Sequence, residues 1–274
     1  MKKILALILA LCMVFALGAC GQQAASKEQA AEETASAQTQ AETAEETASA
    51  ATSAEPTDGT QAEAQAVMSY AEYAAAATDD PVTVKVCVQG HQSWWDNKVT
   101  VYAQDQDGAY FLYEMACSEE DAAKLNPGQW ILVHGFKGEW SGEVEIVDAT
   151  FEFVDEEPFI AEPADVTELF GTDELAAHQN QLISVKGLTV ADKGDGAAFL
   201  YKWDGSGADG DDLYFDVVLN GETYTFTVES YLCGAGTEVY EAVKNLKVGD
   251  TIDIEGFLYW YEGPQPHVTA VTVQ

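Results

Sequence analysis

One segment of this sequence occurs twice, and the repeat constrains the fold more than any other feature. The stretch LNPGQWILVHGF at 125–136 aligns with LKVGDTIDIEGF at 246–257, at an offset of 121 residues. The same offset continues without a gap and pairs further glycines and apolar residues: Gly142 with Gly263, Val147 with Val268, and Ala149 with Ala270. A repeat in fixed register indicates that one small domain was duplicated.

The first copy has the pattern of short strands. Apolar residues alternate with polar ones, Asp107-Gly108 predicts a turn, and Ser118 with the acids after it predicts a short helix that ends at Asn126-Pro127-Gly128. The predicted strands cover 82–88, 99–102, 109–115, 130–136 and 144–154. Short alternating strands argue against a parallel sheet.

The second copy has the same order with one addition. Asn220-Gly221 predicts a tight hairpin, and 239–246 is the predicted helix. The predicted strands cover 182–190, 213–219, 222–228, 251–258 and 268–273. The glycine- and aspartate-rich stretch 191–212 is interpreted as an inserted hairpin or long loop.

The strand and helix order resembles the OB-fold, a small five-stranded barrel with a helix between strands three and four. QSWWDNKVTVYAQDQDGAYFLY (92–113) and GEWSGEVEIVDATFE (138–152) are also similar to OB domains in uncharacterised lipoproteins of Gram-positive gut bacteria. The resemblance covers most of the first copy and, through the repeat, the end of the second. It implies a mainly β protein with two OB-like barrels, each with a short helix, and brings no known ligand and no catalytic residues.

The N-terminus has the layout of a lipoprotein signal. Two lysines precede an apolar run at 4–17, which is too short for a membrane-spanning helix. Leu17-Gly18-Ala19-Cys20 resembles the lipobox of bacterial lipoproteins, in which the cysteine sulfur receives a diacylglycerol and the new amino group is often acylated, for example with palmitate. The resemblance implies that Cys20 anchors the protein to the cell membrane on its extracytoplasmic face. The alternative is an ordinary secretory signal with a chance cysteine.

Composition sets the predicted boundaries. Residues 21–65 are rich in Ala, Glu, Thr, Ser and Gln and contain AEETASA twice, so we expect a disordered tether. The prediction comprises a signal peptide at 1–19, the tether at 20–65, a first OB-like domain at 66–155, a linker at 156–164 and a second OB-like domain at 165–274 with its insertion at 191–212.

Charge limits the partners. The formal net charge is -35 and the sequence contains no arginine; residues 66–274 hold 38 acidic residues and nine lysines. This charge opposes nucleic-acid phosphates. We therefore expect a neutral or cationic partner, a glycan, a peptide or an envelope protein, and regard nucleic acid as unfavourable.

Three cysteines, Cys87, Cys117 and Cys233, follow the signal and the lipidation site. We interpret all three as small buried hydrophobic residues. A Cys87–Cys117 disulfide is the alternative.

Aromatic residues gather where OB-folds place their ligand groove. Trp94 and Trp95 fall between strands one and two, and Trp140 falls between strands four and five. Tyr102 and Tyr110 are expected on the groove face. The candidate ligand-binding residues are Trp94, Trp95, Tyr102, Tyr110, Trp140, Tyr259, Trp260 and Tyr261. The alternative is that some of these rings close the barrel ends, although at least one of Trp94 and Trp95 should be exposed.

Signals for metal binding and catalysis are weak. Asp204, Asp209 and Asp211 are oxygen ligands of the kind calcium prefers, but their spacing fails the EF-hand pattern, so a solvated acidic turn is favoured and no metal or other cofactor is expected. The histidines are isolated, and no nucleophile motif or phosphate-binding loop is present.

The sequence therefore predicts a non-enzymatic, membrane-anchored extracytoplasmic lipoprotein that binds a glycan or a peptide through aromatic loops. A structural or adaptor protein that docks another envelope protein is the main alternative. Single-stranded nucleic-acid binding comes third, because it rests on fold analogy alone.

Overall fold

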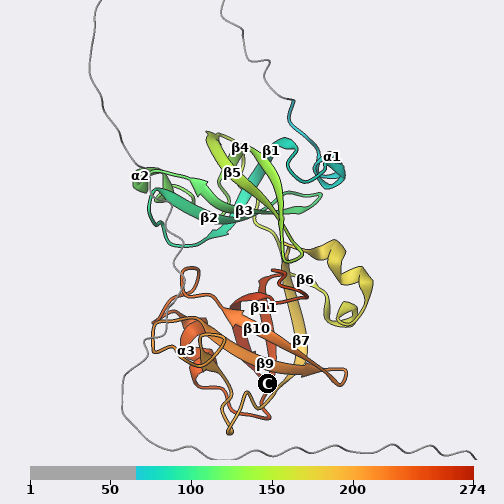
Figure 1. Cartoon of the computed structure of the whole chain (residues 1–274), viewed down its shortest axis with the longest axis vertical. Helices are drawn as coiled ribbons and strands as arrows, with labels where there is room; N and C mark the ends of the chain where they lie inside the picture. Colours follow the sequence, from blue (N-terminus) through green and yellow to red (C-terminus); the bar gives the residue numbers. More distant parts are fainter. Residues whose placement is uncertain (1–65) are drawn as a thin grey trace, which may run out of the picture. The chain divides into compact units, whose positions relative to one another are not determined.

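The described part of the chain, residues 66–274 of the computed structural model, is built from two rings of strands (Figure 1). The predicted signal peptide, Cys20 and the predicted tether lie outside the described residues. The prediction of a mainly β protein with two small five-stranded barrels and short helices is confirmed.

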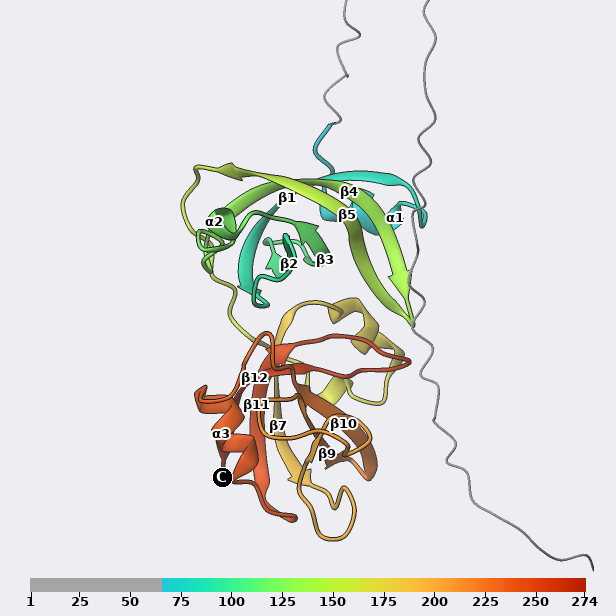
Figure 2. The same ribbon diagram turned by 60° about the vertical axis from the view of Figure 1, so that its left-hand side comes forward.

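Barrel 1 closes in the order β1-β2-β3-β5-β4. Its strands are β1 (Pro81–His91), β2 (Lys98–Gln104), β3 (Ala109–Ala116), β4 (Trp130–Trp140) and β5 (Glu143–Val154), with α2 (Glu119–Ala122) between β3 and β4. Strands β3 and β5 run parallel, and the other neighbours are antiparallel. The hairpin of β4 and β5 is long and curved (Figure 2).

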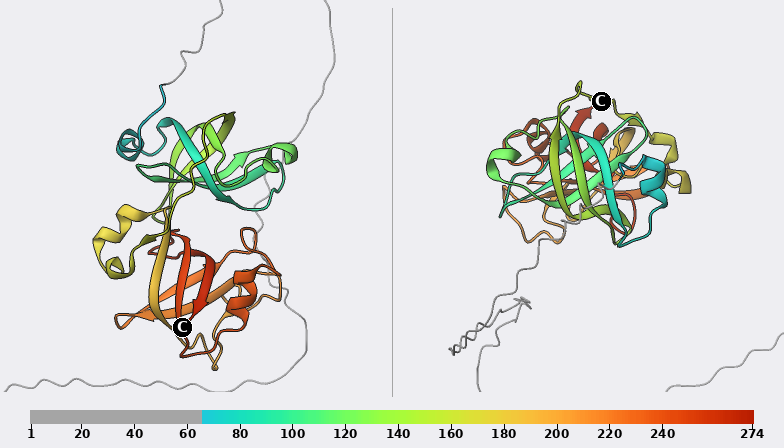
Figure 3. Two further views of the ribbon diagram at one scale, coloured as in Figure 1. Left: turned by 180° about the vertical axis from the view of Figure 1, so that it is seen from behind. Right: turned by 90° about the horizontal axis from the view of Figure 1, so that it is seen from above.

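Barrel 2 has the same strand arrangement, in the order β7-β11-β12-β10-β9, and is closed by pairing between β7 and β9. Its strands are β7 (Leu182–Val190), β9 (Leu213–Leu219), β10 (Glu222–Val228), β11 (Thr251–Phe257) and β12 (His267–Val273). α3 (Glu238–Lys244) follows β10 and packs against β12 (Figure 3, left). Short additions flank the ring: β6 (Ala164–Asp165), β8 (Leu200–Tyr201) within the insertion, and the 3-10 helices η1 (Thr167–Leu169) and η2 (Asp173–His178).

The glycines that define the sequence repeat occupy equivalent positions in the two barrels. Gly135 and Gly256 both lie at a register shift between the fourth and fifth strands. A Cβ at Gly135 would lie 2.8 Å from the carbonyl oxygen of Val147, and one at Gly256 would lie 2.8 Å from the Cα of Val268. Both copies therefore need glycine here because the paired strand passes too close for a side chain.

Each barrel has its own core, and α1 (Tyr70–Ala75) covers part of the first. Ser69 and Glu72 form a capping box at the start of α1. Tyr73 of α1 is buried and packs against Tyr110, with ring centroids 5.0 Å apart.

A third, smaller core joins the barrels. Tyr102 of β2 and Phe111 of β3 pack on Phe257 of β11, with Leu232 and Tyr259 at the margin. The rings of Tyr102 and Phe257 stack with centroids 4.4 Å apart and 16° between their planes. Burial of three large side chains between the barrels stabilises their docking by removing apolar surface from water.

The three cysteines of the described residues are free thiols, so the alternative Cys87–Cys117 disulfide is absent from this structure. Cys87 and Cys117 are buried as expected, and Cys233 is half-buried. Among residues 66–274, no helix has both the length and the apolar character needed to cross a membrane.

Candidate functional site

An aromatic pocket with a volume of about 440 Å³ lies on the outer face of barrel 2. Its lining comes from the β4–β5 turn of barrel 1, the insertion, β9, the β11–β12 loop and β12: Trp140, Trp203, Tyr214, Tyr259, Tyr261, Gln265 and His267. Trp203 and Trp140 have exposed fractions of 74% and 54%. Five rings and no carboxylate or lysine line this pocket, which falls in the size range of small-molecule sites.

Two equivalent turns, one from each barrel, meet at the edge of the aromatic pocket. Trp140 and Tyr261 are related by the repeat offset, and their ring centroids lie 5.3 Å apart. The backbone N–H of Glu262 donates to the carbonyl oxygen of Ser141 at 2.8 Å. The duplicated turns therefore hold each other in place and present their rings side by side.

The buried side chain of Glu143 contacts the turn from barrel 2. Its Oε2 accepts a hydrogen bond from the backbone N–H of Trp260 at 2.8 Å, and the residue has no exposed surface. Its Oε1 has no hydrogen-bond partner among the described residues. Burial raises the pKa of Glu143 to about 8, because the charged form loses its hydration. The carboxyl group is therefore largely protonated at neutral pH.

His267 forms part of the pocket wall in its neutral form. Burial lowers the pKa of His267 to about 3, because the charged form loses its hydration. The hydroxyl of Tyr102 lies 2.6 Å from Nδ1 of this ring and also accepts from the side chain of Gln92. This contact holds the imidazole ring of His267 against β2 of barrel 1. Tyr259 stacks on the imidazole with centroids 4.3 Å apart.

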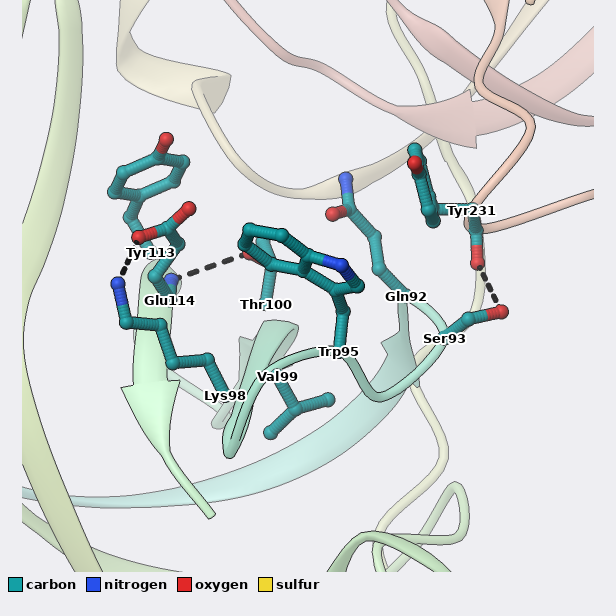
Figure 4. A pocket seen from close by; sticks show the side chains of 9 residues that line it. All are labelled: Gln92, Ser93, Trp95, Lys98, Val99, Thr100, Tyr113, Glu114 and Tyr231. Carbon is teal, nitrogen blue, oxygen red and sulfur yellow. Dashed lines mark hydrogen bonds and ion pairs between the residues drawn. The ribbon is translucent and has the colours of Figure 1, made fainter. Parts of the chain in front are cut away.

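A second pocket of about 250 Å³, which we call the loop pocket, lies beside the β1–β2 loop (Figure 4). Trp95 stands in its centre with an exposed fraction of 59%, between Tyr113 of β3 and Tyr231 of the β10–α3 loop. Lys98 and Glu114, which also line it, form an ion pair at 2.6 Å, so the pocket carries no net charge.

Four of the eight predicted ligand-binding residues line these pockets: Trp95, Trp140, Tyr259 and Tyr261. The expectation that at least one of Trp94 and Trp95 is exposed is confirmed. Trp94 packs against the core of barrel 1, and its indole N–H donates to the carbonyl oxygen of Cys117 at 2.9 Å. Trp260 packs against the core of barrel 2. Trp94 and Trp260 are therefore framework residues.

The placement of Tyr102 and Tyr110 on an open groove face is wrong. Tyr102 does point out of barrel 1, but barrel 2 covers it and both rings are buried. Tyr110 points into the core, because Tyr102 pairs with Phe111 across β2 and β3 and Tyr110 pairs with Ala103. The register shift of this hairpin lies between Tyr110 and Glu114, so these two side chains lie on opposite faces of β3.

Sequence reasoning missed Trp203, Tyr214, Tyr113 and Tyr231. Trp203 could have been identified because it is the one tryptophan in the polar insertion. Tyr214 could have been identified because it alternates with the core residues of β9 and so points outward. No local pattern marks Tyr231, because it reaches the loop pocket only through the docking of the barrels: Ser93 donates its backbone N–H to the carbonyl oxygen of Tyr231 at 2.7 Å.

The three candidate aspartates of the insertion each have a partner within the protein. Asp204 accepts from the backbone N–H of Ser206, Asp209 pairs with Lys244 at 2.9 Å, and Asp211 accepts from the backbone N–H of Ala208. Within residues 66–274, no group of three histidine, cysteine or acidic residues is arranged to hold a metal ion.

The lysines of the described region are largely neutralised. Seven of the nine form ion pairs with carboxylates: Lys85, Lys98, Lys124, Lys186, Lys193, Lys202 and Lys244. Lys137 instead donates to three backbone carbonyl oxygens in and next to α1. Little positive charge remains to attract a phosphate.

Comparison with known proteins identifies distant structural neighbours. Neither a protein-family model nor a curated protein matches the sequence. Similar solved structures include the HINa domain of Ifi202 in complex with 20-bp double-stranded DNA, at 12% identity, a TM-score of 0.32, and coverage of 72% of this chain and 96% of that one. The tetrameric p202 HIN2 domain follows at 13% identity, a TM-score of 0.31, and coverage of 72% and 96%.

A replication protein A heterotrimer bound to single-stranded DNA is also similar, at 14% identity and a TM-score of 0.28, with coverage of 71% of this chain and 49% of that one. At these identities the likeness concerns the tandem OB-like fold alone.

Proposed function

We propose that this protein is a non-enzymatic, membrane-anchored extracytoplasmic lipoprotein that binds a neutral glycan in its aromatic pocket. The observation that carries the proposal is the pocket lining: five aromatic rings, an amide and a neutral imidazole, with no charged group. The anchor at Cys20 rests on the lipobox resemblance.

The chemistry of the aromatic pocket suits a sugar. Aromatic faces bury the apolar C–H faces of pyranose rings, while a few polar groups orient the hydroxyls. Here Gln265 offers an amide donor and acceptor, and His267 offers a neutral imidazole. A peptide with neutral or aromatic side chains is the second ligand class that such a lining accommodates.

Nucleic-acid binding is disfavoured by charge. Single-stranded nucleic acid needs a positive groove as well as stacking platforms. Residues 66–274 hold 38 acidic residues and nine lysines, and seven of those lysines are already paired with carboxylates.

An adaptor role has its own support outside the pockets. Phe136, Phe153 and Ile160 of barrel 1 and its linker are exposed and line neither the aromatic pocket nor the loop pocket. Exposed apolar side chains of this kind can contact another protein.

A fluorescence titration separates these functions. Residues 21–274, which contain all six tryptophans, would be titrated with neutral oligosaccharides, peptides and single-stranded DNA. We expect a saturable change with an oligosaccharide that Trp140→Ala abolishes and Phe136→Ala preserves. Saturation by DNA, weakened by salt, would instead favour the nucleic-acid function, and silence across the panel would favour the adaptor.

A further inference from the structure

One tyrosine from each pocket contacts the same buried phenylalanine. Tyr113 lines the loop pocket and Tyr259 lines the aromatic pocket. Both contact Phe111, with ring centroids 6.3 Å and 5.4 Å from it. Aromatic side chains therefore continue from one pocket to the other.

Each pocket also uses both barrels. The aromatic pocket combines Trp140 of barrel 1 with rings of barrel 2, and the loop pocket combines Trp95 of barrel 1 with Tyr231 of barrel 2. Ser93 holds Tyr231 beside Trp95 through two hydrogen bonds to the carbonyl oxygen of Tyr231: its backbone N–H donates at 2.7 Å and its hydroxyl donates at 3.2 Å. The docking of the barrels thus sets the spacing of the two pockets.

The loop pocket has chemistry like that of the aromatic pocket. Trp95, Tyr113 and Tyr231 are exposed rings. The charges of Lys98 and Glu114 neutralise each other. Figure 4 shows the amide of Gln92 and the hydroxyl of Ser93 at its margin, where they can hydrogen-bond a ligand.

We infer that the two pockets are subsites of one track, which an extended neutral oligosaccharide occupies from the aromatic pocket to the loop pocket. The inference rests on the proposed function and adds the length of the ligand to it. A chain that fills both subsites binds more tightly than one that fills a single subsite, because the second contact is intramolecular.

Isothermal titration with oligosaccharides of two and six units tests this inference. The probes are cello-, malto-, xylo- and chito-oligosaccharides, and the protein is residues 21–274. For the series that binds, we expect the six-unit chain to bind about tenfold or more tightly than the two-unit chain. Trp95→Ala should remove most of that gain and leave two-unit binding unchanged, whereas Trp140→Ala should weaken both.

Phe136→Ala is the control for both variants, since Phe136 is also an exposed aromatic side chain and lines neither pocket. Equal affinity for both lengths, or a length gain that survives Trp95→Ala, would overturn the track and leave the proposed function standing. A loss of two-unit binding in Trp95→Ala would overturn it as well, because the loop pocket would then be the primary site. Absence of binding in all four series would overturn both.

Discussion

Barrel 1 and barrel 2 share one strand order but use the same face differently. In barrel 1 the outward rings of β2 and β3, Tyr102 and Phe111, are buried under barrel 2. In barrel 2 the equivalent strand β9 presents Tyr214 to an open pocket. The same strand face therefore forms the contact between the barrels in barrel 1 and lines an open pocket in barrel 2. The covered face of barrel 1 still contacts the open pocket, because the hydroxyl of Tyr102 lies 2.6 Å from Nδ1 of His267 in the pocket wall.

We expect the largest effect on stability from a substitution in the third core, which joins the two barrels. Phe257→Ala removes the ring that stacks on Tyr102, and we expect a loss of about 3–5 kcal/mol in the free energy of unfolding, as for other buried phenylalanines. Urea denaturation measures it. Phe136→Ala, at an exposed position, is the control and should cost less than about 1 kcal/mol. Similar losses in the two variants would mean that the third core contributes little.

The next effect concerns pH at the edge where the two turns meet. The pKa of Glu143 is about 8 in the folded protein against an ordinary value of 4.5. Its contribution to the free energy of unfolding is therefore fully present below pH 4.5 and is lost as the pH rises through 8. The loss is on the order of 5 kcal/mol. Glu229, whose burial raises its pKa to about 7, acts in the same direction over a narrower range.

Denaturation of the wild type and Glu143→Gln at pH 5 and pH 8.5 isolates this contribution. The glutamine keeps an acceptor for the N–H of Trp260 and cannot ionise, so the variant should lose less stability between the two pH values. An unchanged pH dependence would show that Glu143 is charged and compensated in the folded state.

A smaller effect tests what the copies have in common. Gly135→Ala and Gly256→Ala should each destabilise the protein by about 1–3 kcal/mol, because the new Cβ meets backbone atoms of the paired strand. Gly138→Ala is the control, since its Cβ would meet only side-chain atoms of Val147 and Glu145. If thermal denaturation finds only one of the two glycines sensitive, the barrels are less equivalent than their strand order indicates.

The smallest effect is expected on ligand affinity. Trp203→Ala removes a ring that is 74% exposed, so stability should change little. Affinity for the oligosaccharide should fall about tenfold, which corresponds to about 1.4 kcal/mol. Isothermal titration measures this directly. Undiminished affinity would restrict the site to the rings at the joint of the barrels.

The sequence was most informative where local pattern decides the structure. Alternation located the ten barrel strands, because each strand has one face on a core. The repeat located the glycines that both copies need. Helix α1 was missed although Ser69 and Glu72 have the spacing of a capping box.

The direction in which each side chain points from its strand was less predictable. The β2–β3 hairpin has a register shift between Val99 and Val101, and Glu114 has a positive φ of 46°. This irregularity breaks the alternation between Tyr110 and Glu114, so Tyr110 points into the core although Glu114 does not. Tyr102 was assigned the correct side of its strand, but no sequence pattern shows that the second barrel covers it. Tyr231 and Trp140 join rings of the other barrel for the same reason: the pockets arise from docking.

The six tryptophans allow one direct test of the central claim, that the ligand binds on the open face of barrel 2. The indole N–H signals of ¹⁵N-labelled protein would be recorded during titration with a six-unit oligosaccharide. The account predicts shifts at Trp140 and Trp203, with Trp94 and Trp130 unmoved, because these two indoles donate to the carbonyl oxygens of Cys117 and Glu157. Shifts confined to Trp94 or Trp130, or saturable binding that leaves Trp140 and Trp203 unchanged, would contradict it.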